Sequence, residues 1–231
     1  MFLYEKERVR EIISDRRSAR VGGKLRATLG FIEKLTVSPD EVAPDDAAAL
    51  RAAGVSGRAI TDAVYVCVGF NIINRLADAL DFRVPPPRAF SGAAKFLRLF
   101  GYRLLSGSFV NGRGARPAAP AADDAFADDP HRILVQRLMA DVISGPGTLD
   151  REVREAAGSC AEVPGTLGRY IGEVTQGSYA RAEADIAILR REGYSDDQIF
   201  EATVSAALGA GLRRREVGLI AVRDSAPAPT L

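Results

Sequence analysis

The stretch that most constrains the fold is residues 60–80, ITDAVYVCVGFNIINRLADAL. It contains no proline and a single glycine, and it is long enough for about six turns of α-helix. Apolar side chains surround most of such a helix, which is typical of a helix inside a core. A polar set interrupts them at spacings that predict one shared face: Cys67, Asn71, Asn74, Arg75 and Asp78. Because a buried polar group without a partner costs about 1–3 kcal/mol, this face must be hydrogen-bonded. The sequence therefore predicts a polar seam where a ligand or a polar interface can lie.

Composition and charge narrow the class of protein. The chain has 231 residues, enough for one large domain or two smaller ones, and its 47% apolar and 26% charged content is ordinary for a globular protein. A net charge of +1 gives nucleic-acid binding no general electrostatic help. The first residues, MFLYEKERVREII, lack the apolar region of a signal peptide, and no apolar run approaches the roughly 18 residues of a membrane span. We expect a cytoplasmic protein that binds neither nucleic acid nor membrane.

Cysteine and histidine are too few and too scattered to predict a metal site. Cys67 and Cys160 are far apart, neither belongs to a Cys-x-x-Cys pair, and His131 is the sole histidine. We expect no metal and no cofactor.

Helical periodicity predicts an all-α fold, with no convincing alternating strand. The expected helices lie at about residues 3–18, 25–35, 47–53, 60–80, 131–142, 149–157, 167–176, 179–191 and 196–222. Gly54 and Gly193 are expected to end helices, Ser56 and Ser195 to cap the two long ones, and Asp45 or Asp46 to cap the helix that ends at Gly54.

The segment between the two groups of helices has a different composition. Residues 90–110 combine aromatic and leucine side chains with basic ones, as in a docking arm over apolar surface or a membrane-surface helix. Residues 111–122, NGRGARPAAPAA, read as a linker that continues through an acidic stretch to residue 130. The predicted organisation is a first helical repeat at 1–110, a linker at 111–130, a second repeat at 131–224 and a disordered tail at 225–231.

An internal repeat relates the two groups. Setting Gly54 on Gly193, an offset of 139 residues, also aligns Ser56 with Ser195 and Arg75 with Arg214. The same offset aligns FIEKLT at residues 31–36 with YIGEVT at residues 170–175. Of the polar seam only the arginine is kept, and the second long helix carries stripes of small residues instead: Ser205, Ala206, Ala207, Gly209, Ala210 and Gly211. Small side chains let backbones approach closely, so we expect the long helices to pack on each other or on a second subunit in a homo-oligomer.

The pattern LRxxG(V/Y)S, followed by a long apolar helix carrying FNxxNR, resembles the alkylhydroperoxidase D and carboxymuconolactone decarboxylase superfamily. The matching pieces are LRAAGVSGRAITDAVYVCVGFNIINRLADAL and LRREGYSDDQIFEATVSAALGAGLRRRE, and the likeness covers residues 25–84 and 165–222. It implies an all-α, oligomeric fold of two related helical repeats.

The resemblance also defines what this chain lacks. Peroxidase members of the family carry a Cys-x-x-Cys-x-x-x-His signature before the LRxxG turn, in which one thiolate attacks the peroxide and the second resolves it to a disulfide. The corresponding positions are Pro39, Val42 and Asp46 in the first repeat, and Ser178, Arg181 and Asp185 in the second. None is cysteine or histidine, so the dithiol centre is absent.

Three functions stay open from the sequence. A family member without the dithiol centre could bind a small molecule or a partner, with Asn71, Asn74, Arg75 and Asp78 lining a pocket for an anionic group. These residues could instead form a structural network in which Arg75 pairs with Asp78 or Asp62 and the amides bridge helices. A cofactor-free lyase would use Arg75 and Arg214 to hold a carboxylate substrate, and Glu201 or Asp78 to move protons. A one-cysteine peroxidase would use Cys67, although a buried cysteine is more often an inert apolar residue.

Overall fold

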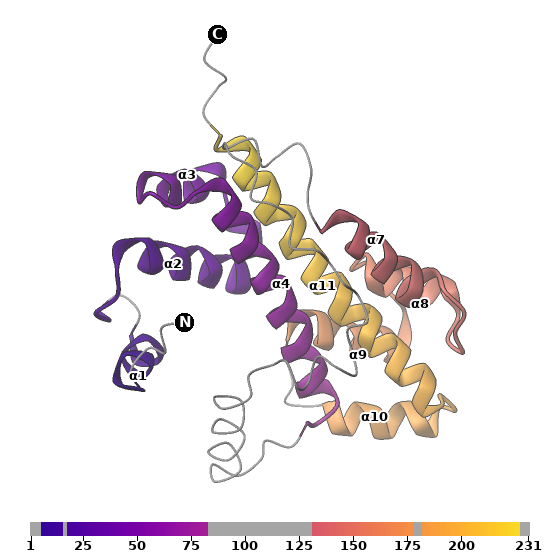
Figure 1. Cartoon of the computed structure of the whole chain (residues 1–231). Helices are drawn as coiled ribbons and strands as arrows, with labels where there is room; N and C mark the ends of the chain where they lie inside the picture. The colour runs from indigo at the N-terminus through magenta and orange to yellow at the C-terminus, as the bar shows by residue number, and fades with distance from the viewer. Residues whose placement is uncertain (1–5, 16–17, 83–130, 178–181, 227–231) are drawn as a thin grey trace, which may run out of the picture. The chain divides into compact units, whose positions relative to one another are not determined.

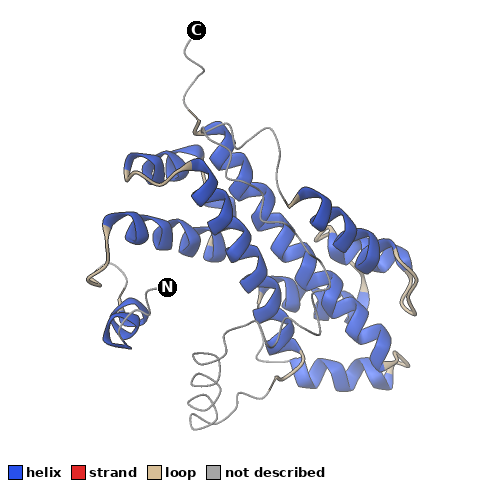
Figure 2. Cartoon of the chain, in the orientation of Figure 1, coloured by secondary structure: helices blue, strands red, loops and turns tan. Residues whose placement is uncertain are grey.

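The computed structural model of the chain describes residues 6–15, 18–82, 131–177 and 182–226. Over these ranges the chain forms helices, turns and irregular segments and no strand, as Figure 2 shows. The predicted all-α class is confirmed. The predictions for residues 90–110 and for the linker at 111–130 lie outside the described residues, as does most of the predicted tail.

Contacts divide the chain into two compact units, residues 1–80 with 123–231 and residues 81–122. Helices from both predicted repeats therefore belong to one unit, the first. In chain order its described helices are α1 (Lys6–Ser14), α2 (Gly23–Val37), the 3₁₀ turn η1 (Pro39–Glu41), α3 (Pro44–Ala52), α4 (Gly57–Ala79), α7 (Arg132–Met139), the π-helical turn η2 (Ala140–Ser144), α8 (Arg151–Gly158), α9 (Gly165–Gln176), α10 (Ala182–Arg191) and α11 (Asp196–Asp224).

Glycine and serine define the starts of the two long helices, as predicted. Gly54 and Gly193 adopt φ of +83° and +97°, a left-handed conformation that ends the preceding helix at little cost only for glycine. The Ser56 hydroxyl accepts a hydrogen bond from the Ala59 N–H at 3.3 Å, and the Ser195 hydroxyl accepts one from the Gln198 N–H at 3.2 Å. Both serines are therefore N-caps.

The start of α3 differs in detail from the expectation. Its N-cap is Ala43, and Pro44 is the first helical residue. Asp46 lies inside the first turn, where its carboxylate accepts a hydrogen bond from the Ala43 N–H at 2.8 Å. Asp46 thus accepts a hydrogen bond from a free N–H at the helix start while lying within the helix itself. The predicted cap position, Asp45 or Asp46, is therefore wrong, and the N-cap is Ala43.

The long helices α4 and α11 lie side by side and make the most extensive packing contact among the described helices (Figure 1). A Cβ atom added to Gly211 would lie 2.6 Å from Ile72 Cγ1, and one added to Gly218 would lie 2.9 Å from Val64 Cγ2. On another face of α11, a Cβ atom at Gly209 would lie 2.6 Å from the Gly158 carbonyl oxygen of α8. The small residues of α11 therefore permit close contact with α4 and α8, and the long helices pack on each other within the chain.

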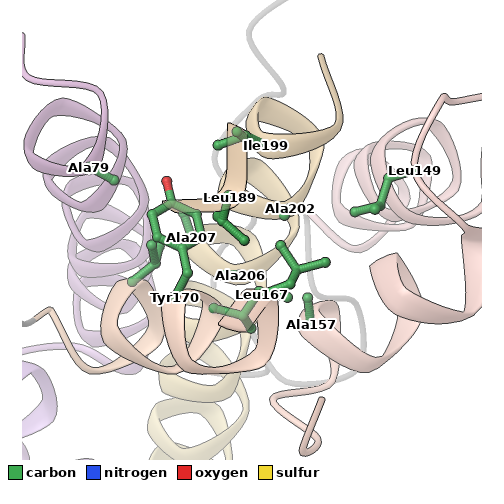
Figure 3. Packing of buried hydrophobic residues seen from close by; sticks show 12 residues of the cluster. Ala79, Leu149, Ala157, Leu167, Tyr170, Leu189, Ile199, Ala202, Ala206 and Ala207 are labelled. Carbon is green, nitrogen blue, oxygen red and sulfur yellow. The ribbon is translucent and has the colours of Figure 1, made fainter. Parts of the chain in front are cut away.

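Buried apolar residues form two clusters, one around α2, α3 and α4 and one around α9, α10 and α11. The first cluster includes Ala221 and Val222 from the end of α11. The second, shown in Figure 3, includes Ala79 from the end of α4 beside Tyr170 and Leu189. Each long helix thus begins in one cluster and ends in the other, which ties the two groups of helices into one core.

The close contact of α8 with α11 predicts opposite effects for two glycine-to-alanine changes. Gly209→Ala should lower the free energy of unfolding by about 1–3 kcal/mol, because its Cβ would press on backbone carbonyls that cannot rotate away. Gly69→Ala in α4 meets no atom within 4 Å and should raise stability by about 0.5–1 kcal/mol through helix propensity. Urea unfolding followed by circular dichroism measures both. Equal stabilisation by the two changes would contradict the close approach at Gly209.

Candidate functional site

Two buried arginines, one from each long helix, form the centre of the candidate site. Arg75 lies near the end of α4 and Arg214 lies in the second half of α11. Arg75 is 5% exposed and Arg214 is 8% exposed, which is unusual for a side chain that is always charged. We call them the arginine pair.

The hydrogen bonds of Arg75 end on neutral groups. Its Nε donates to the Thr175 carbonyl oxygen at 3.1 Å, in the last turn of α9. Its Nη1 donates to the Asn71 carbonyl oxygen at 3.0 Å and to Asn71 Oδ1 at 2.8 Å. Arg75 therefore joins its own helix to the end of α9.

Arg214 makes the corresponding set of bonds on the other side. Its Nε and Nη2 donate to the Thr36 carbonyl oxygen, in the last turn of α2, at 3.3 and 2.8 Å. Its Nη1 donates to the Ala210 carbonyl oxygen at 2.9 Å. Carbonyls in the last turn of a helix have no partner within the helix, and they carry the negative end of its dipole. Each arginine thus satisfies a free carbonyl of a short helix from the other group.

These contacts repeat at the offset that aligns the two halves of the sequence. Thr36 and Thr175, Asn71 and Ala210, and Arg75 and Arg214 are each separated by 139 residues. The first arginine bonds the second threonine, and the second arginine bonds the first threonine. The contacts are therefore reciprocal.

Among the described residues, no ion pair joins a carboxylate to the arginine pair, and the ion pairs of α11 involve other side chains. The expected pairing of Arg75 with Asp62 or Asp78 is absent from the described contacts, and both aspartates are exposed. Asn71 Nδ2 lies 3.4 Å from the Thr36 hydroxyl, so the residues that accept from the two arginines are themselves in contact. Burial lowers the pKa of Arg214, and the positive charge of Arg75 lowers it further. The two guanidiniums therefore repel each other inside the core.

Cys67 lies beside the arginine pair and is only 2% exposed. Its Sγ is 3.3 Å from the Thr36 hydroxyl and accepts a hydrogen bond from Asn71 Nδ2 at 3.3 Å. The same Nδ2 also donates to the Cys67 carbonyl oxygen at 2.9 Å. Cys67, Asn71 and Arg75 follow at four-residue spacing and form one buried, hydrogen-bonded row against α2, α9 and α11.

The rest of the predicted seam is on a different face. Asn74 and Asp78 are exposed, whereas Asn71 and Arg75 are buried. Each exposed residue follows a buried one by three positions, which rotates it about 60° back around the helix and away from the buried row. The prediction that all five residues form one buried seam is therefore wrong, because only Cys67, Asn71 and Arg75 are buried.

Glu201, the predicted acid or base, lies in another network near the start of α11. Its carboxylate accepts hydrogen bonds from the Thr148 and Leu149 N–H groups, both at 2.8 Å, and from the Thr148 hydroxyl at 3.1 Å. Arg154 Nε is 3.8 Å away. Burial acts to raise the pKa of Glu201, but these hydrogen bonds and the charge of Arg154 bring it below its ordinary value. The structure thus places Glu201 as an ionised anchor for the loop before α8, and its catalytic role stays a prediction.

Sequence reasoning missed the position of Cys160. This half-buried residue follows α8 with φ of +56°, a left-handed conformation that is uncommon for cysteine. Burial raises the pKa of its thiol, while the positive charges of Arg213, Arg214 and Arg75 oppose that rise. Cys160 lies directly after the end of α8 that packs closely on α11 at Gly209, a position that the sequence alone did not indicate.

The threonines that receive the arginines carried a sequence signal. The alignment of FIEKLT with YIGEVT already paired Thr36 with Thr175. Arg75 and Arg214 are paired by the same offset of 139 residues, which could have suggested that the two arginines contact the two threonines.

Two features are absent among the described residues. No group of three histidine, cysteine, aspartate or glutamate side chains is placed there to hold a metal ion. None of the described helices combines the length and apolar character needed to cross a bilayer.

Comparison of the chain with models of known protein families, with curated proteins and with solved structures finds no match.

Repulsion within the arginine pair predicts the sign of a double-mutant cycle. Arg75→Met and Arg214→Met each remove hydrogen bonds to carbonyls. Either change alone also removes the repulsion between the two guanidiniums, so the second change in the double variant brings no further relief. The double variant should therefore lose more stability than the sum of the single losses, by about 0.5–3 kcal/mol. Chemical denaturation of the four proteins gives the coupling.

A matched cycle of Arg75→Met with Arg223→Met, at the exposed end of α11, should be additive within about 0.5 kcal/mol. A double loss at Arg75 and Arg214 smaller than the sum would mean that the two arginines support each other and do not repel.

The Glu201 network predicts a pH-dependent loss of stability. Glu201→Gln should cost about 1–3 kcal/mol at pH 7, because the loop N–H groups lose a charged acceptor. The folded-state pKa lies below the unfolded value of about 4.3, so this stability is fully present above that value and is lost as pH falls through the folded pKa. The free energies of unfolding of the wild type and of Glu201→Gln should approach each other as the pH falls from 7 to 3. Glu155→Gln, at a surface ion pair with Arg151, should change stability by less than about 0.5 kcal/mol.

Proposed function

We propose that this chain consists of two copies of an alkylhydroperoxidase D and carboxymuconolactone decarboxylase-like helical repeat, that it has lost the dithiol peroxidase centre, and that it binds a small organic anion at the arginine pair. The observation that carries the anion site is the buried double positive charge of Arg75 and Arg214 without a described carboxylate. The duplication and the family assignment rest on separate observations.

The reciprocal contacts of the arginine pair support duplication. A core contact adds to this support, because Phe31 and Val64 in one apolar cluster correspond at the same offset to Tyr170 and Thr203. Tyr170 and Thr203 have nearly the same shapes as Phe31 and Val64 but carry hydroxyls, whose oxygens are 2.7 Å apart. The Thr203 hydroxyl donates to the Ile199 carbonyl oxygen at 2.6 Å, so Tyr170 donates to Thr203. Paired changes of this kind are expected when two copies of one core diverge.

The positions of the missing peroxidase signature have other roles where they are described. Asp46 binds Lys34 Nζ at 2.7 Å, and Asp185 binds Arg169 Nη2 at 2.7 Å. Ser178 and Arg181 lie outside the described residues. The two aspartates serve as partners of basic residues on the preceding helices, which supports a protein that no longer performs dithiol chemistry.

The case for an anion is electrostatic. Removing a charged side chain from water costs several kcal/mol per ion, and helix-end carbonyls, each equivalent to part of a charge, offset this only in part. A carboxylate near the pair would form short, charge-assisted hydrogen bonds and would remove the repulsion between the guanidiniums. A carboxylate suits the site because arginine binds it through two parallel N–H groups.

The lyase alternative has less geometric support. It needs an acid or base beside the arginine pair, but Glu201 is engaged with the loop before α8 and Asp78 is exposed. The one-cysteine peroxidase alternative has a buried thiol in a polar setting at Cys67, with Thr36 and Asn71 as partners. Both stay predictions, as does a homo-oligomer formed through the long helices.

Ligand-induced stabilisation tests the proposed function. Acetate, benzoate, succinate and inorganic phosphate are titrated against chloride at constant ionic strength, with thermal unfolding and calorimetry as readouts. A bound anion stabilises the folded state by about 2.7 kcal/mol at one hundred times its Kd. We expect this gain in the wild type and in Arg223→Met, and its loss in Arg75→Met and Arg214→Met.

A second substitution guards against loss of folding. Arg75→Lys keeps the positive charge but not the planar two-pronged donor, so it should bind the same anion more weakly while remaining folded. If no anion stabilises the wild type, or if Arg75→Met is stabilised as strongly as the wild type, the arginine pair is a structural device and the proposal fails.

A further inference from the structure

A groove of about 710 Å³ lies between α1 and α2. Its size falls within the range of small-molecule sites, about 300–1,000 Å³. Aliphatic side chains from both helices line it: Ile12, Ile13, Leu29, Ile32 and Val37. Leu29, Ile32 and Thr36 recur at spacings of three and four residues, so they share the face of α2 that borders the groove.

The groove gathers the most exposed large apolar side chains of the described residues. Ile13 of α1 is 79% exposed and Val37 of α2 is 74% exposed, and both line it. Single exposed apolar residues are common on protein surfaces, but apolar side chains gathered around one hollow are typical of a binding site.

The position of α1 does not depend on apolar packing against α2. Among the described helices, none of the pairs in extensive contact includes α1. The Arg20 N–H and Nε donate to the Glu11 carboxylate at 3.2 and 3.1 Å, which ties α1 to the segment that leads into α2. A helix of nine residues is not stable alone and normally depends on the packing of its apolar face. A molecule that fills the groove would supply those missing contacts.

The charged residues of the lining do not favour an anion. Asp15 and Glu33 line the groove, and its described lining contains no basic residue that could pair with a carboxylate. Both acids already have other interactions, so they do not by themselves select a cation. The aliphatic side chains therefore decide what fits, and they suit an uncharged body.

Thr36 can bind a polar end of such a molecule. Its hydroxyl lies 3.4 Å from Asn71 Nδ2, which donates to it, and 3.3 Å from Cys67 Sγ. A hydroxyl has one donor and two acceptor positions, so one position stays open for a ligand.

We infer that this groove binds an uncharged aliphatic molecule with a hydroxyl at one end, whose body packs between Ile13 and Val37 and whose hydroxyl bonds Thr36. The site is separate from the proposed anion site, because such a ligand needs no guanidinium.

An uncharged fluorescent probe, N-phenyl-1-naphthylamine, measures binding, because its emission rises in apolar surroundings. We expect a saturable rise with the full chain, and displacement of the probe by 1-octanol. Octanoate has the same length but a negative head, and 1,8-octanediol carries a second hydroxyl that the aliphatic side chains cannot satisfy. Both should need at least about tenfold higher concentrations than octanol to displace the probe.

Two matched pairs of substitutions test the location. Ile13→Glu and Val37→Glu put a charge into the lining and should weaken probe binding by at least about tenfold. Ile73→Glu and Val66→Glu make the same changes on α4 at positions that are 60% and 58% exposed and do not line the groove, so binding should be unchanged. Because all four positions are exposed, the variants should fold, and circular dichroism checks this.

Hydrogen exchange measures the packing of α1. Octanol should slow exchange of the α1 amides by at least about threefold, because it supplies apolar contacts to a helix that has few, and it should leave α8 unchanged.

Three results would overturn the inference. Probe binding that does not saturate, or that Ile73→Glu or Val66→Glu weakens as much as the groove variants do, would place binding elsewhere. Displacement by octanoate as effective as that by octanol would contradict the uncharged ligand. If the wild type sediments as a dimer that Ile13→Glu and Val37→Glu dissociate, the groove is an interface between two copies of the chain and not a small-molecule site.

Discussion

The structure depends on a close crossing of two helices that each bury a guanidinium. A buried arginine needs several acceptors, and within a helical core the carbonyls of the last turn of a helix are among the few that are free. Arg75 and Arg214 use the ends of α9 and α2 in this way. Because each bond joins one group of helices to the other, the acceptors also determine how the groups are placed along the long helices.

The crossing is possible because the two long helices differ where they meet. Along α11 the facing residues are glycine and alanine, whereas α4 presents Val64, Val68 and Ile72. Bulky side chains on both helices would hold the backbones apart and move the guanidiniums away from the helix ends they bond. If the helices arose by duplication, the copies have specialised: one keeps the small surface and the other keeps the large side chains and the row Cys67, Asn71 and Arg75.

Local signals made much of this fold predictable. Apolar periodicity, glycine at helix ends and serine at helix starts are short-range features, and the two long helices were placed from them to within a few residues. The burial of Cys67, Asn71 and Arg75 followed from the same periodicity. The offset of the repeat also aligned Thr36 with Thr175 before any contact was known.

The partners of the polar residues were not predictable in the same way. In the sequence, nearby acids such as Asp62 and Asp78 are natural partners for Arg75, but both are exposed on α4. The acceptor for Arg75 Nε is instead the Thr175 carbonyl oxygen, one hundred residues away. Every residue has a main-chain carbonyl, so the sequence does not indicate which one accepts the hydrogen bond. Glu201 shows the same limit, because its donors are N–H groups of a loop more than fifty residues earlier.

The hydrogen bonds also link the arginine pair, the proposed anion site, to the Cys67 thiol. Thr36 offers its carbonyl oxygen to Arg214 and its hydroxyl to Cys67, and Asn71 offers its oxygens to Arg75 and its Nδ2 to Cys67. An anion that draws either guanidinium away from these oxygens changes the partners that remain for Thr36 and Asn71. Binding of an anion at the arginine pair would therefore change the environment of the Cys67 sulfur. The sulfur itself is buried, and it contacts neither guanidinium directly in the described hydrogen bonds. If an anion binds at the arginine pair as proposed, the surroundings of this thiol respond to it.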